Sequence, residues 1–261
     1  MKQSAYQNIL KSVCATFLVL FMALPVQAEL NILDATMGET DPSPEVSTAQ
    51  VRHFIKDGSA VVLDSRRMEQ YVAGHIPGAA HIDLKVGSPE YIAEIDKLLD
   101  GDRDNMLVLY CNGPNCGASR SLAKLLVEEG FTNVHRYQLG IPMWRTMGGP
   151  TVMELEGVVR IYDVDRTTVY FDARSPADYK KGTIPGAHSV PSEQIADNVL
   201  GRAPKPGQDM NTRIVIFGKD GAQAQELAEA MSKSPYHNVN YYPGTFESLE
   251  KAIHQKMHKH K

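Results

Sequence analysis

Residues 64–79 read Asp64-Ser-Arg-Arg-Met-Glu-Gln-Tyr-Val-Ala-Gly-His-Ile-Pro-Gly-Ala79. The pattern returns 108 residues later as Asp172-Ala-Arg-Ser-Pro-Ala-Asp-Tyr-Lys-Lys-Gly-Thr-Ile-Pro-Gly-Ala187. The two stretches share eight identities at one spacing, which indicates an internal repeat rather than a chance match. A short apolar run, a turn and a helix-like segment follow each copy. We therefore expect two domains of one architecture.

The two copies differ at the end of the apolar run. Residues 107–111 read Leu-Val-Leu-Tyr-Cys, whereas residues 214–218 read Ile-Val-Ile-Phe-Gly. A thiol in the first copy thus corresponds to a glycine in the second. Glycine carries no nucleophile, so we expect the second half to be catalytically inactive and to shape the cleft or bind a partner.

Short apolar runs alternate with segments of helical periodicity in both halves. Strands are predicted at residues 60–63, 107–110, 134–137, 169–171, 214–217 and 239–242. Helices are predicted to follow Ser47 and Ser88, to contain Leu122 to Leu126, and to span 192–200 and 222–232. This alternation argues for parallel sheets covered on both faces. The predicted fold class is α/β, with a central, mostly parallel β-sheet flanked by helices in each domain.

The first 28 residues have the layout of a secretory signal peptide. Lys2 and Lys11 are their only charged groups, an apolar run covers residues 13–24, and small or modest residues precede a cleavage site after Ala28. We expect an exported, periplasmic protein. The run is short for a bilayer span, and an uncleaved N-terminal anchor is the alternative.

The hydrophobic content of 43% and the net charge of −4 describe an ordinary soluble protein, and no basic stripe interleaved with aromatics points to nucleic acid. The expected parts are a signal peptide (1–28), a lead-in segment (29–46), a cysteine-containing domain (47–150), a cysteine-free domain (151–250) and a basic, histidine-containing tail (251–261). We expect a solvated tail and no metal site, since no cysteine or carboxylate cluster accompanies its histidines.

Cys111 stands at the end of an apolar strand and before a glycine-containing loop and a helix. Ligands bind outside the carboxyl ends of parallel strands, and backbone N–H groups at such a turn converge on one point. A thiol in that cradle is pushed toward the thiolate, which is the nucleophile. The position favours a reactive cysteine over the alternative, an inert core thiol.

With these motifs the chain resembles a tandem protein of the rhodanese family over roughly residues 45–250. The Asp-x-Arg-x4-Tyr-x2-Gly-x-Ile-Pro-Gly-Ala signature occurs twice, and the strand–cysteine–loop–helix segment occurs once. The resemblance implies two rhodanese-like domains and sulfurtransferase chemistry without a cofactor. In that chemistry Cys111 takes a sulfane sulfur from a small anionic donor as a persulfide. It then passes the sulfur to a thiol or cyanide-like acceptor.

The candidate site follows from this resemblance. Cys111 is the catalytic residue, and the expected substrate-binding residues are those of the loop: Asn112, Gly113, Asn115, Cys116, Gly117, Ala118, Ser119 and Arg120. The loop departs from the family pattern, because Arg120 follows nine residues after Cys111 and the loop is about two residues longer. This longer loop leaves the identity of the sulfur donor open. It also weakens an interpretation as a phosphatase, which needs the spacing Cys-x5-Arg.

Two side chains of this loop keep alternative interpretations. Cys116 is a resolving thiol for Cys111, a second sulfur carrier or a small loop side chain. Arg120 balances anionic charge near the loop or lies on the helix surface. After cleavage at residue 28, Cys111 and Cys116 would be the only cysteines of the chain. The sequence leaves open whether these two cysteines form a disulfide in an oxidising compartment.

Asp64 and Arg66 are expected to form a structural ion pair or turn. The cysteine-free copy retains the equivalent Asp172 and Arg174, and their role therefore does not depend on the thiol.

Three functions are compatible with the sequence. The first is an exported sulfurtransferase that uses Cys111. The second is a thiol–disulfide or peroxide-reducing protein that uses Cys111 with Cys116. The third is a non-catalytic module that captures chalcogen or metalloid oxyanions or contacts an envelope protein through the second domain.

Overall fold

The computed structural model describes residues 31–191, 211–233 and 236–258. By its contacts the chain divides into Met1–Ile32 and Leu33–Lys261, and the fold below is that of the second part. The predicted signal peptide and the predicted helix at 192–200 lie outside the described residues. Within the described residues, no helix is long and apolar enough to cross a membrane.

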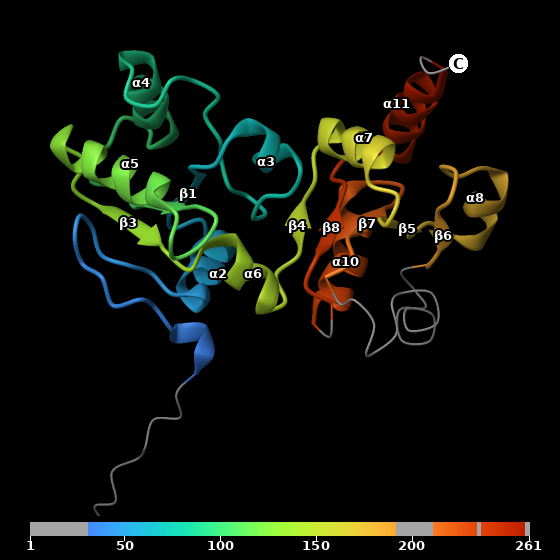
Figure 1. The fold of residues 1–261 in the computed structure, drawn as a ribbon, viewed down its shortest axis with the longest axis horizontal. Coiled ribbons are helices and arrows are strands. Elements are labelled where there is room, and N and C mark those ends of the chain that lie inside the picture. The colour runs from blue at the N-terminus through green and yellow to red at the C-terminus, as the bar shows by residue number, and fades with distance from the viewer. Residues whose placement is uncertain (1–30, 192–210, 234–235, 259–261) are drawn as a thin grey trace, which may run out of the picture. The chain divides into compact units, whose positions relative to one another are not determined.

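The first sheet holds three parallel strands, β1 (Val61–Asp64), β2 (Leu107–Tyr110) and β3 (Val134–Tyr137), in the order β1-β2-β3. Their register aligns Asp64 with Tyr110, and Tyr110 with Tyr137. The carboxyl ends of the strands therefore lie side by side, and the Ser65 N–H just after β1 donates to the Tyr110 carbonyl at the end of β2 at 3.0 Å. Figure 1 labels the two outer strands of this sheet, β1 and β3.

The second sheet holds five strands, all paired in parallel, in the order β4-β8-β7-β5-β6. Its strands are β4 (Thr151–Val152), β5 (Val169–Asp172), β6 (His188–Ser189), β7 (Ile214–Phe217) and β8 (Val239–Tyr241). Two domains with parallel sheets confirm the predicted fold class.

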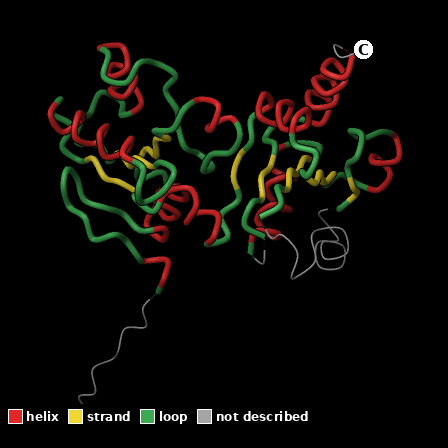
Figure 2. The backbone as a smooth tube through the Cα atoms, in the orientation of Figure 1, coloured by secondary structure: helices red, strands yellow, loops and turns green. Residues whose placement is uncertain are grey.

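Helices cover both faces of each sheet (red in Figure 2). Those of the first domain are α2 (Thr48–Asp57), α3 (Met68–Val72), α4 (Pro89–Leu98), α5 (Gly117–Glu128) and α6 (Gly140–Thr146). The short 3-10 helix η1 (Ile32–Asp34) precedes them in the lead-in segment and contains no buried residue. Those of the second domain are α7 (Leu155–Val164), α8 (Pro176–Lys181), α10 (Gly221–Ser232) and α11 (Phe246–His258). As predicted, Ser47 and Ser88 cap the helices that follow them, and each accepts a backbone N–H.

Alternation along the strands creates two apolar layers per sheet, because successive side chains point to opposite faces. In the first domain, Leu107 and Leu109 pack with α4 and α5, whereas Val108 and Tyr110 pack with α2 and α6. In the second domain, one layer involves α10 and the other α7 and α11. Each half therefore has its own core.

The histidine-containing tail is not a solvated end up to residue 258. Residues from Lys251 onward continue α11, and Ile253 within it is fully buried against the second domain. The expectation of a free tail from 251 was wrong because the apolar residues of this helix cover one face of the sheet.

The first domain contacts the start of the second through the repeat motif. His75 and Val152 exchange two backbone hydrogen bonds of 2.9 Å in an antiparallel bridge. The Glu154 N–H donates to the Val72 carbonyl, also at 2.9 Å. These bonds fix the end of α3 against the start of α7.

Candidate active site

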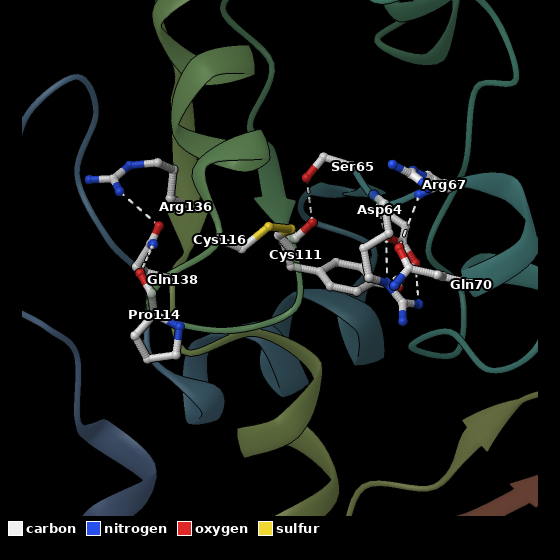
Figure 3. Close-up of a disulfide and its surroundings, with 11 residues drawn as sticks. Asp64, Ser65, Arg67, Gln70, Cys111, Pro114, Cys116, Arg136 and Gln138 are labelled. Carbon is white, nitrogen blue, oxygen red and sulfur yellow. Dashed lines mark hydrogen bonds and ion pairs between the residues drawn. A yellow bond between two sulfur atoms is a disulfide. The ribbon is translucent and has the colours of Figure 1, made fainter.

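Cys111 and Cys116 are joined by a disulfide at the carboxyl edge of the first sheet (Figure 3). Cys111 directly follows β2 and is only 3% exposed, whereas Cys116 is half-buried and is the N-cap of α5. Their Cα atoms lie 6.2 Å apart. Both sulfurs therefore stand near the amino end of a twelve-residue helix, where the helix dipole stabilises negative charge.

The backbone around Cys111 is closely packed. The Ile141 N–H donates to the Cys111 carbonyl at 3.1 Å. Gly140 has a φ of +63°, and a Cβ atom there would lie 2.4 Å from the same carbonyl oxygen. Only glycine accommodates both the positive φ and the close approach of the carbonyl oxygen. Helix α6 can therefore begin next to Cys111.

Gln138 holds the far side of the loop. Its Nε2 donates to the Pro114 carbonyl at 2.7 Å, and its Oε1 accepts from Arg136 Nη1 at 2.9 Å. In Figure 3, Pro114 and Gln138 lie on one side of the disulfide, and Arg67 and Gln70 lie on the other. The loop is therefore anchored from β3 and open toward the repeat motif.

Arg136 is fully buried and binds the lead-in segment. Its guanidinium donates to the carbonyls of Asp41 and Ser43, and Nη1 lies 3.3 Å from Glu39 Oε2. The same carboxylate accepts from Arg120 Nη2. The hydrogen bond from Arg120, with Arg136 adding to it, lowers the pKa of Glu39 below its ordinary value. Arg120 therefore pairs with a carboxylate of the lead-in segment.

A pocket of about 670 Å³ opens beside the disulfide. Four of the nine predicted loop residues line it: Cys111, Asn112, Cys116 and Ala118. The other five, which do not belong to its lining, are Gly113, Asn115, Gly117, Ser119 and Arg120. The structure thus brings together the two cysteines and part of the predicted loop.

The opposite wall of the pocket comes from residues that the sequence pattern did not assign to the site. They are Ser65, Arg66, Arg67, Glu69, Gln70 and, from the second domain, Arg160. The parallel pairing of β1 with β2 was the available signal for the first five, because it places residues 65–70 beside the residues after Cys111. Only the docking of α7 places Arg160 there.

Asp64 and Arg66 form the predicted structural ion pair. Arg66 Nη2 lies 2.5 Å from Asp64 Oδ2 and donates to the Gly74 carbonyl at 2.7 Å, while the Tyr110 hydroxyl donates to the same carboxylate at 2.6 Å. Burial, with the Asp64 charge, raises the pKa of Tyr110 well above its ordinary value. Tyr110 therefore stays protonated.

The cysteine-free copy repeats this ion pair. Arg174 Nη2 lies 2.7 Å from Asp172 Oδ2 and donates to the Gly182 carbonyl at 2.6 Å. The same geometry without a thiol confirms the structural role. Gly218 follows β7 where Cys111 follows β2.

Residues 47–147 and 161–252 match the model of the family described as Rhodanese-like domain. The two matches cover more than half of the chain, and the chain belongs to the rhodanese-like domain family. The predicted resemblance to tandem rhodaneses is therefore confirmed. Sulfur transfer is the general chemistry that this membership supports.

Relatives by sequence agree with this family. The chain is 35% identical over 92 residues to the thiosulfate sulfurtransferase GlpE of Pseudomonas fluorescens, covering 35% of this chain and 76% of GlpE. It is 34% identical over 104 residues to GlpE of Pseudomonas entomophila, covering 40% and 83%. An HTH-type transcriptional regulator of Mycobacterium tuberculosis is 32% identical over 138 residues, half of this chain, which spans 56% of the regulator's length.

Solved structures of similar proteins include the BH2092 protein from Bacillus halodurans. It shares 27% identity and a TM-score of 0.35, over 41% of this chain and 75% of that one. A thiosulfate sulfurtransferase from Pseudomonas aeruginosa shares 22% identity and a TM-score of 0.34, over 76% of this chain and 42% of that one.

Proposed function

We propose that the chain is an exported sulfurtransferase in which Cys111 is the sulfur carrier and thiosulfate-type anions are donors. The observation that carries the proposal is the place of Cys111: it follows a buried strand, lies near the amino end of α5 and lines a 670 Å³ pocket. The layout of residues 1–28 supports export, with cleavage after Ala28.

The reaction begins from the dithiol. A thiol reductant supplies two electrons and two protons to open the Cys111–Cys116 bond. The Cys111 thiolate then attacks the outer sulfur of thiosulfate, a new S–S bond forms, and sulfite leaves with the electron pair of the bond that breaks. A nucleophilic acceptor such as cyanide or a thiolate takes the outer sulfur and regenerates the Cys111 thiolate.

Intact mass spectrometry of the reduced chain tests this function. After thiosulfate, the chain should gain the mass of one sulfur atom, and cyanide should remove it. The Cys116→Ala variant should gain the same mass, whereas Cys111→Ala should gain none.

The same measurement distinguishes a thiol–disulfide protein, which the disulfide in the structure favours as the second candidate. That candidate predicts no sulfur gain in any variant and loss of disulfide exchange in Cys116→Ala. Stable loading of Cys111 in Cys116→Ala would rule it out as the sole function.

A further inference from the structure

Arg160 is the residue of the second domain that lines the pocket beside Cys111. It lies on α7, its side chain is exposed, and it faces a wall otherwise built by residues 65–70 and by the loop. Arg160 also borders a shallower hollow of about 430 Å³ between α7 and α11. The cysteine-free domain thus contributes a cation to a pocket that is lined by Cys111 of the other domain.

Close packing at Gly157 positions α7 over α3. A Cβ atom on Gly157 would lie only 2.0 Å from the Val72 carbonyl oxygen, so the helix approaches α3 with no side chain between them. Residues three apart share a helix face, and Arg160 follows Gly157 by three. Arg160 therefore lies on the side of α7 that faces α3, and it shares the pocket lining with Glu69 and Gln70.

The pocket carries more unpaired positive than negative charge. Arg66 is neutralised by Asp64. In the described ranges, neither Arg67 nor Arg160 has a carboxylate oxygen within 4.0 Å, the limit for an ion pair. Glu69 is the one acidic residue of the lining. Two free guanidinium groups against one carboxylate make the pocket locally cationic in a chain whose formal net charge is −4.

We propose that the cysteine-free domain selects the sulfur donor: Arg160, together with Arg67, binds the anionic end of a dianionic sulfonate-type donor and turns its outer sulfur toward Cys111. The inference rests on the proposed sulfur transfer at Cys111. Guanidinium groups pair with oxyanions through directed N–H bonds. The sulfite that leaves keeps its charge on the same oxygens, so the two arginines stabilise both donor and leaving group. Arg160 is a specificity residue, and Cys111 performs the covalent step.

Sulfur loading of the reduced, full-length chain at increasing donor concentration tests the proposal. Thiosulfate is the dianionic probe and methanethiosulfonate the monoanionic one, with loading read as sulfur gained in intact mass. The variants are Arg160→Ala, Arg160→Lys, which keeps the charge, and Arg166→Ala. Arg166 is a matched control, since it is exposed in the same domain, just after α7, and does not line the pocket.

We expect Arg160→Ala to raise the half-saturating thiosulfate concentration about five- to tenfold, the scale of one partly exposed charge-assisted contact. The rise should be smaller for methanethiosulfonate and should shrink in high salt. Arg160→Lys should recover most of the affinity, and Arg166→Ala should match the unmodified chain.

Equal effects of Arg160→Ala and Arg166→Ala, or no effect of Arg160→Ala in a chain that loads normally, would overturn donor selection and leave sulfur transfer intact. A chain that gains no sulfur from either donor at any concentration would overturn both proposals. Because Arg160 is exposed, its variants should unfold at the same temperature as the unmodified chain, and a thermal scan verifies this.

Discussion

The carbonyl oxygen of Val72 lies 2.0 Å from the point that a Cβ atom on Gly157 would occupy. The two domains therefore meet at a position where no side chain fits. Gly157→Ala should lower the free energy of unfolding by about 2 kcal/mol, because α7 must move to relieve the overlap, and should weaken thiosulfate loading. Urea denaturation measures the first effect and the loading titration the second.

Gly117→Ala is the control for that variant. A Cβ atom on Gly117 meets nothing within 4 Å, and the residue opens α5, so alanine should be tolerated or slightly stabilising. Equal unfolding free energies for the two variants would contradict the tight contact at Gly157.

Reduction should switch on sulfur loading. In the disulfide state neither sulfur is a thiolate, and Cys116 is the more exposed of the two. A small thiol should attack Cys116 and release the buried Cys111 thiolate as the leaving group. The oxidised chain should show little loading and gain it with mild reductant, whereas Cys116→Ala should load without reductant. Loading of the fully oxidised chain at the reduced rate would refute this.

Gln138→Glu should loosen the loop without removing the acceptor that faces Arg136. The carboxylate can still bind Arg136 but has no N–H for the Pro114 carbonyl, which now accepts at 2.7 Å. We expect a loss of about 1 kcal/mol in unfolding free energy and slower loading of Cys111. Asn133→Ala serves as a control, since it also removes a side-chain bond to a backbone carbonyl, that of Asp104, at the other end of β3. Loading equally fast in both variants would count against a positioning role for Gln138.

Acidification should destabilise the fold through His75. Burial lowers the pKa of His75 to about 4 from 6.5, and its ring stacks on Tyr71 with centroids 3.8 Å apart. Between pH 6.5 and pH 4, His75 is protonated in the unfolded chain but stays neutral in the folded chain. The contribution of His75 to the free energy of unfolding is therefore fully present above pH 6.5 and is lost as the pH falls toward 4. The loss should reach about 3 kcal/mol from this group.

The difference between the unmodified chain and His75→Gln isolates this effect from other titrations. Urea unfolding at pH 7 and pH 4.5 should show a smaller acid loss in His75→Gln. His254→Gln should leave the loss unchanged, because His254 is exposed on α11. An identical acid loss in His75→Gln and the unmodified chain would exclude His75 as the cause.

Residues 107–110 and 214–217 were predicted as strands because four-residue apolar runs are distinctive, and both were placed correctly. Residues 134–137 read Val-His-Arg-Tyr, a weaker strand signal, and were also placed correctly. The two-residue strands β4 and β6 and the short helix α3 were missed, since so few residues carry no periodicity. The longer helices α7 and α11 were also not predicted. Length is therefore necessary for a local pattern to show an element, but it is not sufficient.

The site was predictable where it depends on one strand end and not where it depends on packing. The position of Cys111 follows from the run before it. Arg120 was expected near the substrate, but the lead-in segment runs along β3, where Glu45 bridges to Arg136, and it brings Glu39 to Arg120. Arg160 lines the pocket because α7 packs against α3 at Gly157, and no local sequence pattern predicts that tertiary contact.

The hydrogen bonds between the lead-in segment and Arg136 show that the folded first domain includes residues ahead of the segment that the family model matches. The family matches begin at residues 47 and 161, yet three of the four residues that accept hydrogen bonds from the Arg136 guanidinium, Glu39, Asp41 and Ser43, lie ahead of residue 47. A fragment cut at the family boundary would lose Glu39, Asp41 and Ser43 as acceptors for Arg136 and would keep only the bond to Gln138. The physical domain is thus longer than the segment that the family model matches, and residues ahead of that segment bind a side chain in the middle of the domain.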